Sequence, residues 1–342
     1  MIQFAHFDFN IYVMCGATFA VALIVCLLFT PLVRRMAFKV GAFDQPDGDR
    51  RVHVEPTPRL GGIAIYLSFM LSLFVILNIA LNNNLVIVRF LSDRDLAHII
   101  GLLFGGTLMM GVGLWDDIMH MSPQRKFAAQ FVVALIATVL YGFTIYHLKI
   151  PFIGPVDLAW FGIPFSLFWY LGMVNAINFL DGLDGLVAGY AAIACVSLAI
   201  VSIMHGQYLV AIIASTLAGS ALGFLPYNYN PARIFMGDSG ALFIGFVLAS
   251  IGVMGTEKEA VAISLAVPLL VLALPILDTA SVIVRRIRNR TPVFAADREH
   301  MHHRLLDLGL SQRQAVMLFY AVGGLLGAAA IALSRFGGSR TF

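Results

Sequence analysis

The sequence predicts an all-α protein that crosses a membrane many times, with about ten transmembrane helices. Of its 342 residues, 60% are hydrophobic and only 12% are charged, whereas a soluble domain of this size needs a surface rich in charge. Apolar runs near the roughly 20 residues that span a bilayer recur along the whole chain. No repeat of fixed period and no soluble insertion interrupts them, so we expect a single membrane-embedded domain over residues 1–342.

Ten apolar runs are predicted to cross the bilayer. They are residues 10–30, 61–81, 97–115, 127–146, 159–177, 186–204, 208–226, 240–256, 260–283 and 315–334. The first run starts near an acidic residue, Asp8, and no small-residue cleavage motif follows it, so it is expected to be retained instead of removed as a signal peptide. The three cysteines lie inside apolar runs and are interpreted as small buried residues. An even number of crossings places both termini on one side.

The distribution of charge predicts which side each loop faces. Most of the 22 lysines and arginines fall in the loops after the odd-numbered runs, which the positive-inside rule places in the cytoplasm with both termini outside. Acids and histidines suited to chemistry gather on the same side. They are Asp116, Asp117, Asp181, Asp184, Asp238, Asp297, Glu299, His53, His120, His300, His302 and His303. Any reaction is therefore expected in a cleft that faces the cytoplasm.

The first polar motif is the acidic pair Asp116 and Asp117 at the end of one run, with Lys126 and Gln130 at the start of the next. Two adjacent carboxylates at a membrane boundary repel each other, and a divalent cation would relieve that repulsion. The same pair would also suit an ordinary helix end at the water interface. The motif alone leaves both interpretations open.

The second motif, NAINFLDGLDGL over residues 175–186, places Asn175, Asn178, Asp181 and Asp184 at intervals of three. That spacing stacks the side chains on one face of a helix end, and the glycines between them allow a ligand to approach the backbone. A helix-terminating turn with a capping aspartate explains one Asp-Gly pair but not two. Carboxylate and amide groups of this kind suit Mg²⁺ or a sugar nucleotide.

The third motif, NYNPARIFMGDSGALFIG over residues 228–245, runs from Asn228 to the start of the next apolar run. Asp238 or Ser239 could be no more than the N-cap of that helix, but the free N–H groups of its first turn could equally receive a phosphate. Phe235 could stack on a flat base, although an aromatic side chain beside a membrane span is also common as interfacial packing.

The fourth motif lies in the longest cytoplasmic loop, where His300, His302 and His303 stand beside Arg304. Zinc would be one interpretation, but no cysteine is near and the spacing of the histidines is not a usual structural zinc pattern. The cluster is equally well explained as a pyrophosphate clamp. Asp278, an isolated carboxylate inside the ninth run, is expected to pair with a polar group of the bundle.

Taken together, these motifs resemble the polyprenyl-phosphate N-acetylhexosamine-1-phosphate transferase family, of the glycosyltransferase 4 type. The matching stretches are PTPRLGG (56–62), DD (116–117), NAINFLDGLDGL (175–186), NPARIFMGDSG (230–240) and DREHMHHRLLDLGLSQRQ (297–314). They follow one another along nearly the whole chain and fall on one side. The form REHMHHR looks like the GlcNAc-1-phosphate branch, which serves O-antigen, enterobacterial common antigen or teichoic acid linkage synthesis.

The resemblance implies a reaction, a cofactor and a set of partners. Members of the family transfer a sugar-1-phosphate from a UDP-sugar to undecaprenyl phosphate, release UMP and need Mg²⁺, for which Mn²⁺ can substitute. We therefore expect a bacterial plasma-membrane enzyme that binds UDP-GlcNAc, undecaprenyl phosphate and membrane lipid but no nucleic acid. Its active site is expected to face the cytoplasm, and a homodimer is left open.

The resemblance also suggests roles for individual residues. Asp238 is expected to be the first metal ligand, helped by Asp117, Asp181 or Asp184. Asp116 or Asp117 would position the lipid phosphate or accept its proton, although a phosphate whose second pKa is about 6 is mostly ionised at pH 7.

Further residues are assigned to the phosphates and to the substrate. Lys126, His302 and His303 would neutralise the phosphates as part of the catalytic set. The substrate-binding residues are expected to be Asn178, Asp181, Asp184, Asn228, Phe235, His300 and Arg304.

Three alternatives are weighed against this interpretation. Within the family, the chain could instead transfer phospho-N-acetylmuramoyl-pentapeptide for peptidoglycan synthesis, or could use another UDP-N-acetylhexosamine. From another class, it could be a transporter of lipid-linked sugars. Transporters place their ionisable groups near the bilayer midplane, in two related halves. Here the acids gather at one membrane face and the halves show no evident symmetry.

Overall fold

The computed structural model describes residues 2–44, 57–82, 91–150, 154–256, 266–289 and 301–337. In chain order the elements are α1 (Ile2–Val40), β1 (Phe43–Asp44), β2 (Thr57–Pro58), α2 (Gly61–Asn82), α3 (Asp93–Met119), α4 (Pro123–Leu140), β3 (His147–Ile150), β4 (Gly154–Asp157), η2 (Ala159–Phe161), α5 (Gly162–Leu180), α6 (Leu186–Met204), α7 (Tyr208–Asn228), α8 (Gly237–Thr256), α9 (Ala266–Val271), α10 (Ala273–Asn289), α11 (Met301–Asp307) and α12 (Gln312–Gly337). The strands form two short antiparallel pairs, β1–β2 and β3–β4. The all-α class is confirmed.

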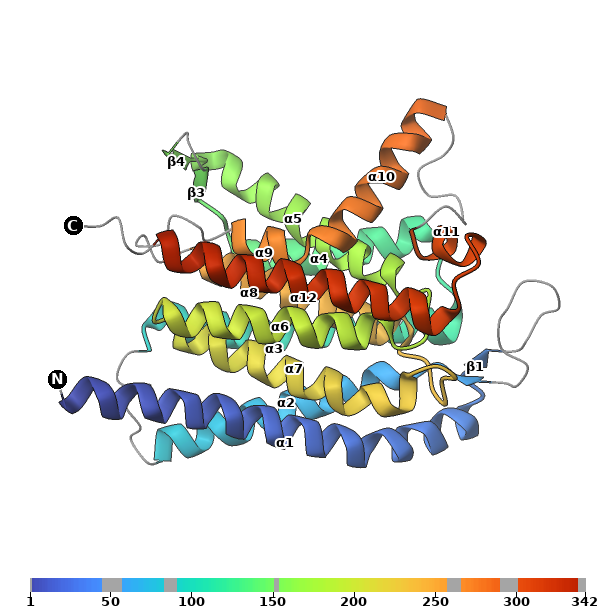
Figure 1. The fold of residues 1–342 in the computed structure, drawn as a ribbon, viewed down its shortest axis with the longest axis horizontal. Coiled ribbons are helices and arrows are strands. Elements are labelled where there is room, and N and C mark those ends of the chain that lie inside the picture. The colour runs from blue at the N-terminus through green and yellow to red at the C-terminus, as the bar shows by residue number, and fades with distance from the viewer. Residues whose placement is uncertain are drawn as a thin grey trace.

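Among the described residues, eight helices are long and apolar enough to cross a membrane. They lie in α1, α2, α3, α5, α6, α7, α8 and α12. The protein is thus a multi-pass membrane protein, as its composition predicts. The helices run roughly side by side, and α1 begins at the end of the bundle where α12 finishes (Figure 1). This arrangement agrees with an even number of crossings.

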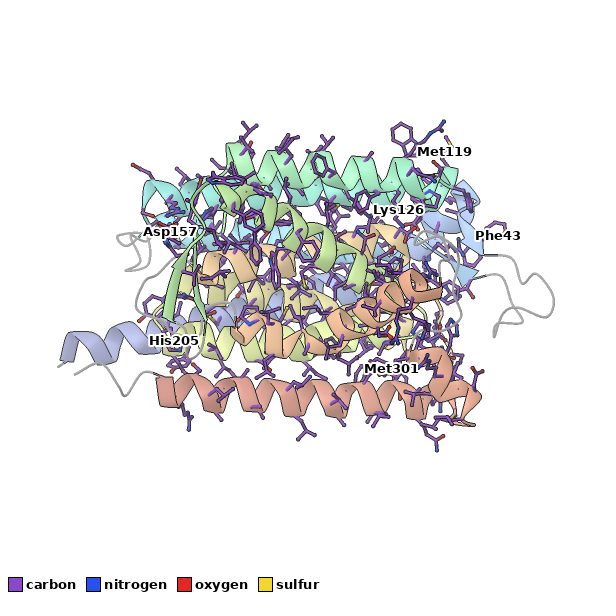
Figure 2. The ribbon with its side chains drawn as sticks, turned by 90° about the horizontal axis from the view of Figure 1, so that it is seen from above. Phe43, Met119, Lys126, Asp157, His205 and Met301 are labelled. Atoms are coloured by element: carbon purple, nitrogen blue, oxygen red, sulfur yellow. The ribbon has the colours of Figure 1, made fainter. Side chains whose placement is uncertain are left out.

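The fourth predicted crossing differs from its expected form. We predicted a helix over residues 127–146, but α4 begins at Pro123 and ends at Leu140. Its first turn carries Arg125 and Lys126, so it is less apolar than the eight spans. The helix still runs through the bundle, because Met119 at the end of α3 and the β3–β4 pair at Asp157 lie at opposite ends (Figure 2).

The ninth predicted crossing, over residues 260–283, is broken within its described part. Helix α9 stops at Val271, and α10 starts anew at Ala273. Pro275 explains the break, because proline has no N–H to donate to the carbonyl of Val271. The second piece, α10, continues to Asn289 and leaves the bundle at an angle (Figure 1).

The core of the bundle is formed by α6, α7 and α8. In their spanning windows 78%, 83% and 89% of the residues are buried, against 33% in α1 and 28% in α12. Glycines allow the first turn of α8 to be held closely between α2 and α3: a Cβ at Gly62 would collide with the backbone of Gly240, and one at Gly113 would collide with the backbone of Asp238. Asp238 is thereby fixed at one end of the most buried helix.

The segment before α2 holds the loop that precedes α8. The backbone N–H of Phe235 donates to the carbonyl of Pro58 at 2.7 Å, and the N–H groups of Gly61 and Gly62 donate to the carbonyls of Phe235 and Met236 at 2.9 and 2.8 Å. Two sequence motifs that are far apart along the chain are thus joined by main-chain hydrogen bonds. This contact positions the start of α8.

Candidate active site

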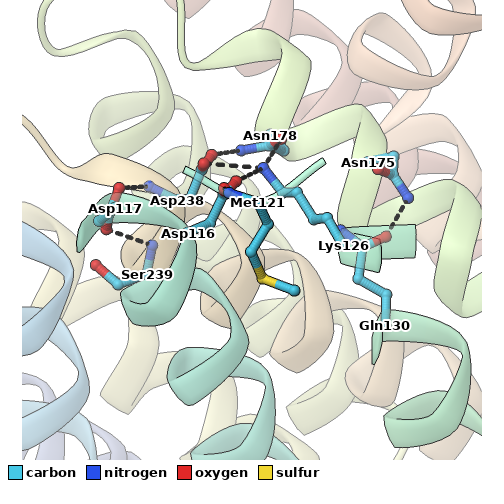
Figure 3. A network of polar contacts seen from close by, with 9 residues as sticks. All are labelled: Asp116, Asp117, Met121, Lys126, Gln130, Asn175, Asn178, Asp238 and Ser239. Carbon is cyan, nitrogen blue, oxygen red and sulfur yellow. Dashed lines mark hydrogen bonds and ion pairs between the residues drawn. The ribbon is translucent and has the colours of Figure 1, made fainter. Parts of the chain in front are cut away.

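Four polar side chains from four helices meet (Figure 3) at the end of the bundle where Lys126 lies (Figure 2). Nζ of Lys126, in the first turn of α4, lies 2.9 Å from Oδ2 of Asp116 and 2.9 Å from Oδ2 of Asp238. The same ammonium donates to Oδ1 of Asn178 at 3.1 Å, and Nδ2 of Asn178 donates to Oδ1 of Asp238. We call Asp116, Lys126, Asn178 and Asp238 the lysine cluster.

The charge of Lys126 is secured by its neighbours. Burial alone would lower the pKa of this lysine, but the carboxylates of Asp238 and Asp116 outweigh burial and hold the pKa above its ordinary value. The side chain of Lys126 is only 16% exposed. The cluster therefore presents a fixed, partly desolvated cation, which interacts with an anion more strongly than a lysine in bulk water does.

Asp117 performs a different task from its neighbour Asp116. Its Oδ1 accepts the backbone N–H of Asp238 at 2.8 Å, and its Oδ2 accepts that of Ser239 at 3.0 Å. It therefore caps α8 from another helix. Gly237 makes room for this carboxylate: its φ is +72°, and a Cβ there would lie 2.7 Å from Oδ2 of Asp117.

This cap excludes two interpretations of residues 237–240 (GDSG). Asp238 is not the cap of α8, because its carboxylate is directed at Lys126 and Asn178. The N–H groups of Asp238 and Ser239 are not left for a phosphate either, since Asp117 accepts both. The expected roles of Asp117 as metal ligand or base stay predictions, and Asp117 would have to fill them while capping the helix.

Asp181 is the carboxylate in the turn that follows α5. It is half-buried just after α5, and among the described residues its side chain accepts no hydrogen bond. Burial, followed by the negative charges of Asp238, Asp117 and Asp184, raises the pKa of Asp181 to about 8, and Arg59 opposes the rise. Arg59, from the PTPRLGG stretch, is thus near enough to act on this site, although no site role was predicted for it.

A second amide pair lies one helical turn away from the lysine cluster. Nδ2 of Asn175 donates to Oε1 of Gln130 at 2.8 Å, which joins α5 to α4 beside Asn178 and Lys126 (Figure 3). Gln130 is fully buried. This contact could not be predicted from the sequence, since the hydrogen bond depends on how α4 packs against α5.

Asp184, Asn228 and Asn230 join the turn before α6 to the segment between α7 and α8. The amide of Asn230 also donates to Oε1 of Gln312. The amide of Asn228 accepts from the N–H of Gly185 at 3.0 Å and donates to the carbonyl of Ile234 at 3.0 Å. Oδ2 of Asp184 accepts from Nδ2 of Asn230 and from the N–H of Ala232, both at 3.0 Å. We call Asp184, Asn228 and Asn230 the loop clamp, because they fix the segment between α7 and α8.

The clamp changes what is expected of two predicted site residues. Asn228 is 3% exposed and Asp184 is 5% exposed, so both are buried. Their ligand roles stay predictions, but the structure gives each of them backbone partners that account for its burial.

The histidine loop reaches the site through α11. His302 is 2% exposed, and its ring lies against Gly182, where a Cβ would collide with the Nε2 atom. The ring of His303 is 4.2 Å from that of His302, centroid to centroid. His302 therefore lies next to Asp181. Arg304 is exposed on the same helix.

Of two further predicted site residues, Phe235 is described by the structure and His300 is not. Phe235 is half-buried and its backbone is bonded to the segment before α2. His300 lies outside the described residues.

The acids fit a hard divalent cation in chemistry but do not form a closed metal cage. Among the described residues, no three His, Cys, Asp or Glu side chains converge closely enough to hold a metal ion. Mg²⁺ is usually bound by one or two carboxylates together with water and substrate phosphates. Asp238 and Asp181 suit that mode, and the mutual repulsion of the acids favours a bound cation.

Comparisons with known proteins show which family has this sequence. Residues 99–256 match the model of glycosyl transferase family 4. The chain is 35% identical over 316 residues to the probable undecaprenyl-phosphate N-acetylglucosaminyl 1-phosphate transferase of Bacillus subtilis, covering 92% of this chain and 84% of the relative. This chain belongs to that family.

Other members of the family bear two kinds of name. The decaprenyl-phosphate N-acetylglucosaminephosphotransferase of Mycobacterium leprae is 34% identical, over 89% of this chain and 80% of the relative. The phospho-N-acetylmuramoyl-pentapeptide-transferase of Listeria innocua is 32% identical, over 92% of this chain and 96% of the relative. The predicted polyprenyl-phosphate N-acetylhexosamine-1-phosphate transferase family is therefore confirmed, and the protein is a membrane-embedded transferase of this type.

Proposed function

We propose that this enzyme transfers GlcNAc-1-phosphate from UDP-GlcNAc to undecaprenyl phosphate, giving undecaprenyl-pyrophosphoryl-GlcNAc and UMP. The observation that carries the proposal is the lysine cluster, a desolvated cation held between two carboxylates and an amide at the end of the bundle. The names of the Bacillus and Mycobacterium relatives support the choice of GlcNAc and of a polyprenyl phosphate.

The reaction brings two anions together. An oxygen of the lipid phosphate attacks the β-phosphorus of the UDP-sugar, a new P–O–P link forms, and the bond from the β-phosphorus to the bridging oxygen breaks. UMP leaves with that oxygen and its electron pair. Because the lipid phosphate is largely ionised at neutral pH, the main task of the protein is to offset like-charge repulsion in the transition state.

Each side chain of the cluster has a part in that task. The ammonium of Lys126 would interact with the reacting phosphates. Asp116 would hold that ammonium in place through their ion pair at 2.9 Å. Met121 fixes Asp116 in turn, because its backbone N–H donates to Oδ1 of that carboxylate at 2.6 Å. Asn178 would keep Asp238 oriented through their hydrogen bond.

Asp238 and Asp181 are the residues that would hold Mg²⁺. When bound, the ion would supply Lewis-acid stabilisation of the diphosphate. Mn²⁺ has the same preference for oxygen ligands. We expect turnover to stop in EDTA and to return with Mg²⁺ or Mn²⁺ but not with Zn²⁺.

The proposed location is the bacterial plasma membrane, with the site at the cytoplasmic face. The positive-inside rule supports that side, since Lys126 belongs to the lysine cluster, Arg59 acts on Asp181, and Arg313 donates to the carbonyl of Asn230 in the loop clamp. Their charge would attract both anionic substrates.

A second candidate is transfer of phospho-N-acetylmuramoyl-pentapeptide, favoured by the Listeria relative at 32% identity. One assay separates the two. Purified protein is incubated with undecaprenyl phosphate and Mg²⁺, and UMP release is followed with UDP-GlcNAc, UDP-N-acetylmuramoyl-pentapeptide and other UDP-N-acetylhexosamines in parallel. UDP-GlcNAc should be used fastest. Preferential use of the pentapeptide donor would overturn the proposal, and release of UMP without lipid product would exclude transfer.

A further inference from the structure

A carboxylate outside the lysine cluster contacts the helix that carries the histidines. Asp278 is 3% exposed on α10, whose outward residues Leu277 and Ile287 are each 63% exposed. A carboxylate that points into a membrane bundle is costly unless it has a partner. Its Oδ1 accepts the backbone N–H of Met301, the first residue of α11, at 2.8 Å.

That hydrogen bond leads directly to the active site. The residue after Met301 is His302, whose ring lies against Gly182 next to Asp181. His303 follows, with its ring against that of His302. Asp278 therefore holds the end of α11 from which both histidines extend, and it does so from a separate helix, 23 residues earlier in the chain.

We propose that Asp278 is a positioning residue: it anchors α11 so that His302 and His303 face the Asp181–Gly182 turn. The proposal rests on the proposed function for its kinetic test. The bond is charge-assisted, because the carboxylate accepts from a backbone N–H, and such bonds are roughly twice as strong as neutral ones. Loss of the bond would free the start of α11 while leaving the bundle helices in place.

Three variants test the role. Asp278→Ala removes the acceptor, so kcat/KM with UDP-GlcNAc should fall on the order of tenfold. Asp278→Asn keeps an acceptor oxygen and should recover most of that loss. Thr279→Val is the matched control: Thr279 is the adjacent residue, 8% exposed, and its hydroxyl has no hydrogen bond among the described residues. It should match wild type.

A double-mutant cycle separates positioning from simple destabilisation. If Asp278 acts through His302, His302→Ala should cost much less in the Asp278→Ala background than in wild type, because the ring is already misplaced. If the two losses multiply, Asp278 has no positioning role. Full activity of Asp278→Ala would overturn the proposal as well.

Hydrogen exchange gives a readout that does not depend on the substrate. In Asp278→Ala, the amides over 301–307 should exchange faster, while those of α8 stay protected. Unchanged exchange at Met301 would contradict the anchor even if the assigned substrate were correct. A wild-type enzyme that ignores UDP-GlcNAc but shows this local exchange effect would instead disprove the proposed function and keep the anchor.

Discussion

The lysine cluster and the loop clamp lie at the same end of the bundle and use similar residues, yet their partners differ in kind. Asp116, Lys126, Asn178 and Asp238 bond mainly to one another from four helices. In the clamp, Asn228 bonds to the backbone of Gly185 and Ile234, and Asp184 accepts the backbone N–H of Ala232. The amide of Asn230 donates to the side chains of Asp184 and Gln312 and so completes the clamp.

The difference indicates which polar groups are available for chemistry. When a side chain that bonds to buried backbone groups moves away, it leaves a donor or acceptor without a partner. Each such group lowers the stability of the fold by about 1–3 kcal/mol. Side chains that pair with each other can exchange those partners for a substrate or an ion. We therefore expect substitutions in the lysine cluster to remove activity, and those in the clamp to remove stability.

The largest effect is expected for Lys126→Met, which keeps the length of the side chain and removes its charge. Turnover should fall on the order of 10³-fold, because the cation that faces the phosphates is lost. Arg125→Met is the control, since Arg125 is the exposed neighbour on the same turn and should remain active. UMP release under saturating substrates measures both, and equal losses in the two variants would contradict a special role for Lys126.

The histidine variants are expected to have the next largest effect. His302→Ala and His303→Ala should each lower turnover by about tenfold or more through loss of a phosphate contact. Only His302→Ala should also lower Tm, because His302 is buried whereas His303 is half-buried. His147→Ala, on the exposed hairpin, is the control. A fully active double variant would make the histidines ordinary loop residues.

In the clamp, Asn228→Ala should act on stability. It leaves the N–H of Gly185 and the carbonyl of Ile234 without these hydrogen bonds. This should lower the free energy of unfolding by on the order of 1–3 kcal/mol for each group. Thermal unfolding in detergent should show a clear fall in Tm, with turnover per folded molecule reduced only a few-fold. Asn78→Ala, which loses only a bond to Phe74 within its own helix, should change little. A stable but inactive Asn228→Ala would move Asn228 into the binding site.

The smallest effect is expected for Asp181→Asn and has the opposite sign. The folded pKa of Asp181 is about 8 against an ordinary value of 3.8, so ionisation of this group costs the folded state stability as pH rises from about 4 to 8. In EDTA, the variant should melt a few degrees above wild type at pH 8, and this advantage should vanish near pH 4. A constant difference across that range would show that its charge is not responsible.

Much of this division could be predicted from sequence, because the acids, Lys126 and the histidines fall in loops or at the ends of apolar runs that the charge pattern assigns to one side of the membrane. The break between α9 and α10 was not predicted, although Pro275 within the expected helix over 260–283 indicates where it falls. The partners could not be predicted. That Asp117 caps α8, or that Asn228 spans from Gly185 to Ile234, depends on helix packing through glycines such as Gly62 and not on local spacing.

The most direct test of this division is Asp238→Asn, measured for rate and Tm on the same preparation. The helix keeps its cap, because Asp117 bonds to the backbone of residues 238 and 239, and Asn retains the shape of the side chain. We predict an unchanged Tm within a few degrees and a loss of turnover on the order of 10²-fold or more. An active variant with ordinary Mg²⁺ dependence, or one whose activity loss merely follows a collapsed Tm, would contradict the assignment of the lysine cluster to chemistry.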